Sequence, residues 1–465
     1  MILEEVQMKK HTMLSLSLSV VVFIIMLNPL SYHVIEADDC LFESFPSHNS
    51  FNNQNKINSI IESVSESLIK RYLNDLYNIT VCYGDRMTGS EGSFHAAEFI
   101  HKSFSDMNNQ SLSITSNSWV AFGDRWHPGI YADQNIIAEL PGVHENGSVI
   151  VFFVHFDTVR NSLGADDDGS GVAALLAAAQ ILSQYRFNHT ILFCASSGEE
   201  MGDLGDNHEA SSFYESQNDI IAAITADAIG YNPDVDNKNQ NSVVLYKPDR
   251  SQWIADEVLS VFQQYSDEIG LNKVRLGGFF GNSGNRAYDN YGFSTLKFFE
   301  GITNPGWENP PHTNDTIDFI NFSYLTNVTK LIAASIAFIA DLPPLSQHVS
   351  IASPREDALY VNGKLVSWFP LFKGKTICIG SNLVVKPVIQ QNNFNSVEAV
   401  NFKVFTGEND IKSDVERIMV FNIMDDTVPF EYQITSRLSG WHTIRTTLMN
   451  GNQYENCDEV EVFFI

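Results

Sequence analysis

The sequence VIVFFVH, residues 149–155, is an apolar run that ends in a histidine. A second run, TILFC at residues 190–194, leads into the acidic pair Glu199-Glu200. Between them, GADDDGSG at residues 164–171 places three carboxylates in a glycine-rich turn, ahead of an alanine- and leucine-rich segment typical of a helix. Short apolar runs that alternate with helical segments predict parallel strands, whose carboxyl ends carry polar side chains at one edge of the sheet.

The same alternation continues from residue 136 to about residue 341, and it predicts an α/β fold with a mostly parallel central sheet and helices on both faces. The expected strands are residues 149–154, 190–194, 221–226, 243–246 and 294–299, and the expected helices are residues 171–182, 252–265 and 321–340. Upstream, apolar side chains at helical spacing over residues 57–76 predict one further helix with a single buried face.

A domain boundary is predicted at Leu342-Pro343-Pro344-Leu345, because proline cannot continue the preceding helix. Beyond it, brief β-type runs separated by Gly, Asn and Asp indicate a small β-sandwich. These runs are residues 383–389, 399–405, 417–421, 442–447 and 459–464. We therefore expect an α/β domain over residues 38–345 and a β-sandwich over residues 346–465.

The N-terminus carries Lys9 and Lys10, then an apolar stretch at residues 13–27, then polar sequence around Asp38. About 15 apolar-to-small residues fall short of the roughly 20 that a membrane span needs. We therefore expect a secretory signal peptide over residues 1–37 and no membrane span in the mature chain. The protein is then secreted or displayed at the cell surface.

The composition restricts the partners of this chain. It has 465 residues, 44% of them hydrophobic, and a formal net charge of -28. The hydrophobic fraction is ample for a packed core. No cluster of Lys and Arg follows the first few residues, so the composition argues against nucleic acid and anionic membranes as partners.

Seven Asn-x-Ser/Thr sequons suit an exported glycoprotein, and they lie at Asn78, Asn109, Asn146, Asn188, Asn314, Asn321 and Asn327. A glycan at Asn314 would crowd His312, so we expect that sequon to be unoccupied. The cysteines are Cys40, Cys82, Cys194, Cys378 and Cys457, an odd number that leaves at least one unpaired. Cys378 and Cys457 share the C-terminal region and could form a disulfide, whereas Cys194 lies within an apolar run.

Six side chains along the predicted sheet and its loops have the chemistry of a metal site: His155, Asp167, Glu199, Glu200, Asp227 and His312. Each has an ordinary explanation when taken alone, since the acidic loop offers helix caps, Asp227 suits a turn and His312 lies in a loop. Together they predict a site for two divalent metals, with one carboxylate left to move protons. Asp157, two residues after His155, is placed to fix the orientation of the imidazole ring.

Two further motifs extend the pattern, RMTGS at residues 86–90 and QNIIAELPG at residues 134–142. With them, residues 72–341 resemble the secreted di-zinc aminopeptidases of metallopeptidase family twenty-eight. The resemblance implies two zinc ions, held as follows: Asp167 bridges both, His155 and Asp227 bind one, and Glu200 and His312 bind the other. It also implies a cis peptide bond between Asp167 and Asp168.

The activity implied by the resemblance is the removal of N-terminal residues from peptides with a free N-terminus. A water shared by the two zinc ions would attack the scissile carbonyl, while Glu199, as general base, would take the proton and return it to the leaving amine. The chain departs from the family at Pro311, where many members have a tyrosine that stabilises the oxyanion. Ser283-Gly284-Asn285 stands where relatives often have Ser-Asp-His, so we expect substrate preference to differ.

The C-terminal region resembles the bacterial immunoglobulin-like domains appended to exported enzymes. PFEY at residues 429–432 and GWHTI at residues 440–444 carry this resemblance. The region is either a spacer or packing partner, which we favour, or a module that attaches the enzyme to a cell surface or polymer.

Other functions remain open. A carboxypeptidase or dipeptidase of the same fold would need a cation for the substrate carboxylate, for which Arg286 is the candidate. An inactive receptor or adhesion protein should have lost metal ligands or the base, and this sequence keeps all of them. A single-zinc glutaminyl cyclase is disfavoured, because His155 and Asp227 together imply two metals.

Overall fold

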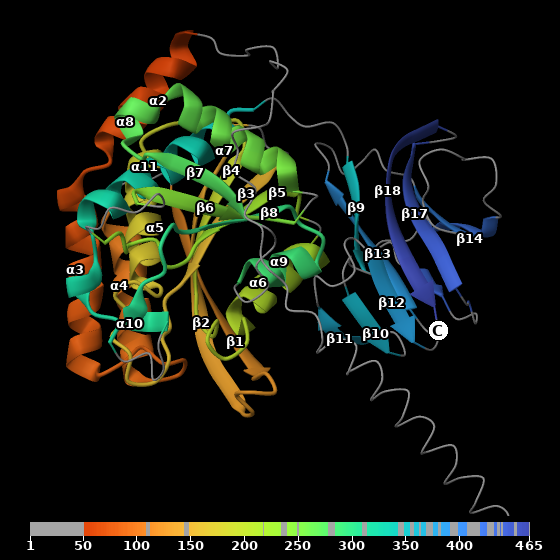
Figure 1. Cartoon of the computed structure of the whole chain (residues 1–465), viewed down its shortest axis with the longest axis horizontal. Coiled ribbons are helices and arrows are strands. Elements are labelled where there is room, and N and C mark those ends of the chain that lie inside the picture. The colour runs from red at the N-terminus through yellow and green to blue at the C-terminus, as the bar shows by residue number, and fades with distance from the viewer. Residues whose placement is uncertain are drawn as a thin grey trace, which may run out of the picture.

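The computed structural model describes residues 51–107, 112–143, 148–216, 218–233, 240–248, 251–277, 284–308 and 314–342, and the strands between residues 348 and 464. An α/β part is followed along the chain by an all-β part (Figure 1). The α/β part confirms the predicted fold class. The predicted signal peptide, residues 1–37, and Cys40 lie outside the described residues.

One eight-stranded sheet forms the centre of the α/β part, in the order β1-β2-β4-β3-β5-β8-β6-β7. Its strands are β1 (Ser113–Phe122), β2 (Ile130–Leu140), β3 (Val149–His155), β4 (Thr190–Ser196), β5 (Ile220–Ala226), β6 (Ser242–Tyr246), β7 (Lys273–Gly277) and β8 (Thr295–Glu300). The adjacent strands β4, β3, β5 and β8 run parallel, whereas β1 and β2 form an antiparallel ribbon at one side. The carboxyl ends of the four parallel strands therefore lie at the same edge.

Helices cover both faces of this sheet (Figure 1). They are α2 (Phe51–Ser63), α3 (Glu66–Tyr83), α4 (Glu91–Asp106), α5 (Gly169–Leu182), α6 (Leu204–Glu215), α7 (Gln252–Gln264), α8 (Ser266–Ile269), α9 (Asn285–Asn290), α10 (Pro305–Glu308) and α11 (Phe322–Ala340), with a 3-10 helix at Ile317–Phe319. The side chains of β3 alternate between two cores. Phe152 and Val154 pack with residues of α5 and α11, whereas Val151 and Phe153 pack with residues of α6 and α9. Burial on both faces explains why β3 is apolar throughout.

The predicted strands of the sheet and the helices that follow them are confirmed, but the single helix expected over residues 57–76 is wrong. Two helices, α2 and α3, occupy this segment. Ser65 separates them, because its backbone is extended (φ -114°, ψ 147°) and its side chain accepts a hydrogen bond from the N–H of Leu68 at 3.3 Å. This N-cap interrupts the helix that apolar spacing alone predicts.

Helix α11 is the one described helix that is long and apolar enough to cross a membrane. However, 72% of its most apolar window is buried inside the protein. Leu325 and Ile332 are among its side chains in the larger core. The helix therefore packs as a core element of the α/β part.

The described elements after α11 are β-strands, and they form two sheets. The seven-stranded sheet, in the order β11-β10-β12-β18-β17-β14-β15, contains β10 (Ala358–Val361), β11 (Lys364–Trp368), β12 (Lys375–Ile379), β14 (Ala399–Thr406), β15 (Met419–Asp425), β17 (Gly440–Asn450) and β18 (Gln453–Phe464). The three-stranded sheet contains β9 (His348–Ser353), β13 (Leu383–Gln390) and β16 (Tyr432–Ile434). Because β9 packs against β17 and β18, the two sheets are layered as a sandwich requires. The boundary between residues 345 and 346 stays a prediction.

The disulfide considered between Cys378 and Cys457 does not fit this strand register. Cys378 is buried and free, and it pairs with Phe464 across β12 and β18. Cys457 lies near the other end of β18, where it pairs with Thr447 of β17. Seven positions of extended strand span about 23 Å, whereas a disulfide needs Cα atoms within about 7 Å of each other.

Candidate metal centre

His155 ends β3, and its imidazole is buried at the carboxyl edge of the sheet. The Nε2 atom lies 3.2 Å from Oδ1 of Asp167, and within the described residues it makes no hydrogen bond. Ligand atoms of His155, Asp167 and Asp227 all lie within 4.8 Å of one another. An imidazole nitrogen without a hydrogen bond, gathered with two carboxylates, fits the donor set of zinc.

The charges around His155 favour a cation at this position. Burial alone would lower the pKa of His155. The carboxylates of Glu199, Asp157 and Asp167 outweigh the burial and hold that pKa well above its ordinary value. The centre is therefore a place of negative potential that either a proton or a metal ion would neutralise.

The three aspartates of the loop at residues 164–171 have different structural roles. Asp166 is buried and accepts a hydrogen bond from the N–H of Gly230 at 2.7 Å. Asp168 caps α5, since its Oδ1 accepts a hydrogen bond from the N–H of Gly171 at 3.0 Å. Only the middle acid, Asp167, belongs to the cluster of metal-ligating atoms. The peptide bond between Asp167 and Asp168 is cis, as the family resemblance implies.

Asp157 connects the end of β3 to the loop of the two glutamates. The Nδ1 atom of His155 lies 3.2 Å from the backbone carbonyl oxygen of Asp157 and 3.5 Å from its carboxylate. The backbone of Asp157 is thus the closer support of the imidazole ring. Its carboxylate accepts hydrogen bonds from Thr88 Oγ1 at 2.9 Å and from the N–H groups of Glu199 and Glu200 at 3.2 and 3.3 Å.

Glu199 and Glu200 follow β4 and are partly buried beside the cluster. Burial is the main cause that raises the pKa of Glu199 well above its ordinary value, against the opposing effect of His155. Burial also raises the pKa of Glu200, and the carboxylate of Asp167 contributes next. A carboxylate with a raised pKa accepts a proton more readily, which is what a general base requires.

The structure describes Asp227 and Glu200 of the predicted ligand set, but not His312. Asp227 directly follows β5 and belongs to the cluster with His155 and Asp167. Glu200 lies next to this cluster but outside the three-residue group. His312 and Pro311 lie outside the described residues, so their predicted roles stay predictions.

Lys297 is a residue of this centre that the sequence analysis missed. Its side chain is 2% exposed, and its Nζ donates a hydrogen bond to Oδ2 of Asp227 at 2.7 Å. The sequence does contain a signal, because a lysine inside the apolar strand β8 requires a buried partner. A permanent positive charge therefore shares Asp227 with any metal bound there.

Asp315, also missed, fixes the acidic loop from the opposite side. Its buried carboxylate accepts hydrogen bonds from the N–H groups of Asp166 at 3.0 Å and Asp167 at 2.9 Å. Burial raises the pKa of Asp315 well above its ordinary value, and the nearby Asp166 adds to the effect. Since Asp315 follows His312 by three residues, it links the loops of two predicted ligands.

Arg86 explains the RMTGS motif in structural terms. Its side chain is fully buried, and it donates to the carbonyl oxygens of Phe156 at 2.6 Å, Leu163 at 3.1 Å and Gly164 at 2.9 Å. These bonds brace the segment that connects His155 to the acidic loop. The arginine thus supports the metal centre without belonging to it.

Arg286, the cation considered as the binding group for the carboxylate of a carboxypeptidase substrate, is already paired with an acidic residue. Arg286 donates from Nε to Oδ2 of Asp203 at 2.9 Å, and its Nη2 contacts the same oxygen. Asp203 is buried. The guanidinium charge is therefore balanced within the protein, which weakens the case for Arg286 as a receptor for a substrate carboxylate.

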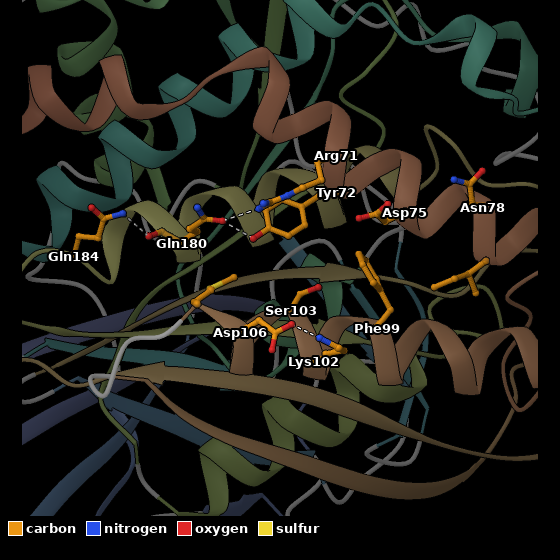
Figure 2. A pocket seen from close by; sticks show the side chains of 12 residues that line it. Arg71, Tyr72, Asp75, Asn78, Phe99, Lys102, Ser103, Asp106, Gln180 and Gln184 are labelled. Atoms are coloured by element: carbon orange, nitrogen blue, oxygen red, sulfur yellow. Dashed lines mark hydrogen bonds and ion pairs between the residues drawn. The ribbon is translucent and has the colours of Figure 1, made fainter.

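A pocket of about 780 Å³ lies away from this centre, between α3, α4 and the end of α5 (Figure 2). Its side chains bind one another: Oε1 of Gln180 accepts hydrogen bonds from Arg71 at 3.0 Å and from Tyr72 at 2.6 Å. Gln180 lies about 17 Å along α5 from its first residue, Gly169, beside the acidic loop. The pocket contains none of the predicted site residues.

A mostly parallel α/β sheet that gathers a histidine and carboxylates at its carboxyl edge, beside two glutamates, defines a zinc metallopeptidase of the α/β class. Residues 135–336 match the model of peptidase family M28, so this part of the chain is similar to the zinc metallopeptidases of that family.

Individual proteins agree with this match. The chain is 22% identical to a probable zinc metalloprotease of Leptosphaeria maculans, over 64% of this chain and 79% of that protein. It is 24% identical to leucine aminopeptidase 1 of Paracoccidioides brasiliensis, over 60% and 72% of the two chains. Among solved structures, the LapA aminopeptidase of Legionella pneumophila has a TM-score of 0.52 at 18% identity, with 68% and 79% covered. An aminopeptidase from an Aneurinibacillus species has a TM-score of 0.50 at 14% identity, with 62% and 97% covered. These structural matches concern the fold.

Proposed function

We propose that this protein is an exported aminopeptidase that uses two zinc ions and removes N-terminal residues from peptides. The observation that carries the proposal is the cluster of His155, Asp167 and Asp227 beside Glu199, a partly buried glutamate with a raised pKa. Asp167, His155 and Asp227 would hold one zinc, and Glu200 and His312 would complete the second site around Asp167. Zinc bound there supplies a Lewis acid for the scissile carbonyl and lowers the pKa of water.

The residues of the chain perform the proton transfers and the positioning. Glu199 takes a proton from the attacking water and returns it to the leaving amine, which restores the carboxylate for the next cycle. Asp157 fixes the position of Glu199 through the 3.2 Å hydrogen bond from its backbone N–H. Arg86 and Asp315 hold the segments before and around Asp167, so that the base and the ligands keep a constant separation.

Two observations favour a free amine over a free carboxylate as the recognised end of the substrate. The centre is surrounded by carboxylates strong enough to raise the pKa of buried His155, and this negative potential attracts an ammonium group. Arg286, the cation considered for a carboxylate, is paired with Asp203. Relatives named leucine aminopeptidase support the same choice.

The remaining parts of the proposal concern export. Residues 1–37 would be removed as a signal peptide, and the mature protein would carry glycans on exposed sequons. The C-terminal strands would form an immunoglobulin-like spacer that packs beside the catalytic part and does not contribute to catalysis.

The test is a panel of aminoacyl and dipeptidyl chromogenic amides, each with a free and a blocked N-terminus, together with zinc analysis of the mature protein. We expect two zinc ions per chain and cleavage of the free substrates alone. Equal cleavage of blocked and free substrates would refute the aminopeptidase assignment. Cleavage that depends on a free C-terminus would favour a carboxypeptidase, and less than one zinc per chain would refute a peptidase of either kind.

A further inference from the structure

Within the described residues, the four most exposed large hydrophobic side chains, Phe122, Val120, Trp126 and Ile130, lie on strands β1 and β2 and the turn between them. Among the described residues, the exposed large hydrophobic side chains other than Val143 lie between residues 81 and 130: Val81, Tyr83, Phe94, Val120, Phe122, Trp126 and Ile130. Val120 is 72% exposed and Phe122 is 78% exposed. Single exposed apolar residues are common, but a cluster of this kind marks an interaction surface.

These four residues belong to the β1–β2 ribbon, which projects beyond the rest of the sheet (Figure 1), whereas Val81, Tyr83 and Phe94 lie on α3 and α4. Phe122 of β1 is paired with Ile130 of β2, and Val120 is paired with Ala132, so these side chains share one face of the ribbon. We call Val120, Phe122 and Ile130 the ribbon face. All three are more than two-thirds exposed.

The opposite face of the ribbon is packed against the loop that contains Glu199 and Glu200. Trp119 and Tyr131 contact Met201 in a small hydrophobic cluster, and the N–H of Asp124 donates to the carbonyl oxygen of Met201 at 3.1 Å. The ribbon is therefore held in place. Its free face points away from the loop that contains Glu199, so a substrate bound at that loop would not cover it.

Strand β1 is also the outer strand of the sheet, so one side of its backbone has no neighbour among the described strands. The N–H of Gly123 donates to the carbonyl oxygen of Gly129 at 3.0 Å, so these two residues form a hydrogen-bonded pair. Because the register between β1 and β2 is regular, hydrogen-bonded pairs alternate along the ribbon, and they fall at the odd-numbered positions of β1. The even-numbered positions from Ile114 to Phe122 therefore direct their N–H and C=O groups outward. Within the described part of the chain, these outward groups make no hydrogen bond.

The sequence of β1 lacks the usual protection of an edge strand. SITSNSWVAF contains no charged residue and no proline, and its register with β2 has no bulge. Edge strands of monomeric proteins are normally blocked by such features. A ten-residue edge without them is suited to pair with another strand.

We propose that β1 pairs antiparallel with β1 of a second copy of this chain, so that the protein is a two-fold symmetric dimer with a continuous sheet. The surface is self-complementary, as an isologous interface requires. Pairing centred on Ser118 places Phe122 opposite Ile114 of the partner subunit, so that an apolar residue faces an apolar residue at each end. The chain carries a net charge of -28, and an uncharged strand is where two such chains can approach without bringing like charges together.

The test is sedimentation velocity of the mature full-length protein over a range of concentrations. The wild type is expected to sediment as a dimer that dissociates on dilution. Val120→Lys should shift the protein to the monomer at concentrations where the wild type is dimeric, because it places a charge on the ribbon face. Val143→Lys, the same change at an exposed valine outside the ribbon face, should leave the dimer intact.

A second variant separates backbone pairing from apolar contact. Ser118→Pro removes an outward N–H but no hydrogen bond between β1 and β2, so it should also give a monomer. A dimer that survives Ser118→Pro would overturn the edge pairing. A wild type that is monomeric at every concentration would overturn the dimer.

The same experiments identify other occupants of the ribbon face. A monomer that co-sediments with phosphatidylcholine vesicles would replace the dimer with a membrane surface. A monomer in which Val120→Lys raises KM for long peptides, but not for aminoacyl amides, would replace it with a substrate-docking site. Both outcomes contradict the proposal and leave the aminopeptidase assignment unaffected.

Discussion

At the scale of single residues, the carboxylate of Asp227 has two partners, the predicted metal ion and Lys297. It is a predicted ligand that lies within 4.8 Å of His155 and Asp167, and its Oδ2 accepts a 2.7 Å hydrogen bond from Lys297. A buried ammonium so close to a metal position repels a divalent cation. It also occupies one of the two oxygens that Asp227 could offer. In the proposed two-zinc arrangement, the zinc held by Asp227 should therefore be the more weakly bound one.

Replacing Lys297 with methionine should strengthen zinc binding by about tenfold or more, because the change removes the positive charge and keeps a side chain of similar length. Isothermal titration of the zinc-free protein measures the two dissociation constants directly. Lys330→Met, at a lysine of α11 that donates to the carbonyl oxygen of Glu268, is the control and should have no effect. Unchanged or weaker zinc binding in Lys297→Met would show that the lysine acts mainly as a support of Asp227.

Glu199→Gln should lower kcat by about 10²- to 10⁴-fold, because the amide cannot accept the proton of the attacking water. Zinc content should stay at the wild-type value, since Glu199 is predicted to move protons rather than to bind metal. Steady-state kinetics on a free aminoacyl amide and metal analysis of the same preparation check both points. Full activity in this variant would remove Glu199 from its role as the base.

At the scale of elements, the acidic loop between β3 and α5 is positioned by residues far from it in sequence. Arg86 holds the carbonyl oxygens of Leu163 and Gly164, and Asp315 holds the N–H groups of Asp166 and Asp167. The loop itself has no regular hydrogen-bonding ladder, so these side chains satisfy its buried backbone groups. The position of Asp167 thus depends on two distant segments.

Asp315→Ala should destabilise the fold by about 2–5 kcal/mol, because it leaves one buried and one partly buried N–H group without an acceptor. It should also weaken zinc binding by about 10- to 100-fold, as expected when an outer support of a ligand is lost. Urea unfolding and zinc titration measure the two effects. Asp318→Ala, at an exposed position three residues away, is the matched control, and equal effects of the two changes would contradict the role of Asp315.

At the scale of the whole molecule, buried carboxyl groups make the stability depend on pH. Burial raises the pKa of Asp206 to about 8, although the hydroxyl of Ser196 opposes the shift through a 2.6 Å hydrogen bond. Between about pH 4 and pH 8 the folded protein keeps a proton on Asp206 that the unfolded chain has released. The free energy of unfolding therefore falls as the pH rises through this window.

Asp206→Asn should reduce this fall, because asparagine has no proton to lose and has nearly the same shape. As the pH increases, the free energy of unfolding of the variant should rise relative to that of the wild type, by up to about 1.4 kcal/mol for each pH unit. Urea unfolding of both proteins at pH 5 and at pH 8 gives this difference. Asp75→Asn, at an exposed position, is the control, and the prediction fails if Asp206→Asn and the control respond to pH in the same way.

The sequence by itself determined the class of fold and the core of the centre. Apolar runs and helical spacing are local properties, so they predicted β3, β4, β5 and their helices. The family resemblance predicted the set that the structure brings together at His155, Asp167 and Asp227. These residues could be found because each directly follows a strand or belongs to a recognisable loop.

Only the tertiary structure decided which distant residues complete this centre and where local expectations fail. Lys297, Asp315 and Arg86 act through contacts across 70 to 149 positions of sequence, and the periodicity of the sequence does not predict such contacts. The register of β18 likewise separates Cys378 from Cys457, which the spacing of the cysteines could not show. Local patterns report which element a residue joins, whereas the partner of a buried charge is fixed only when the elements pack.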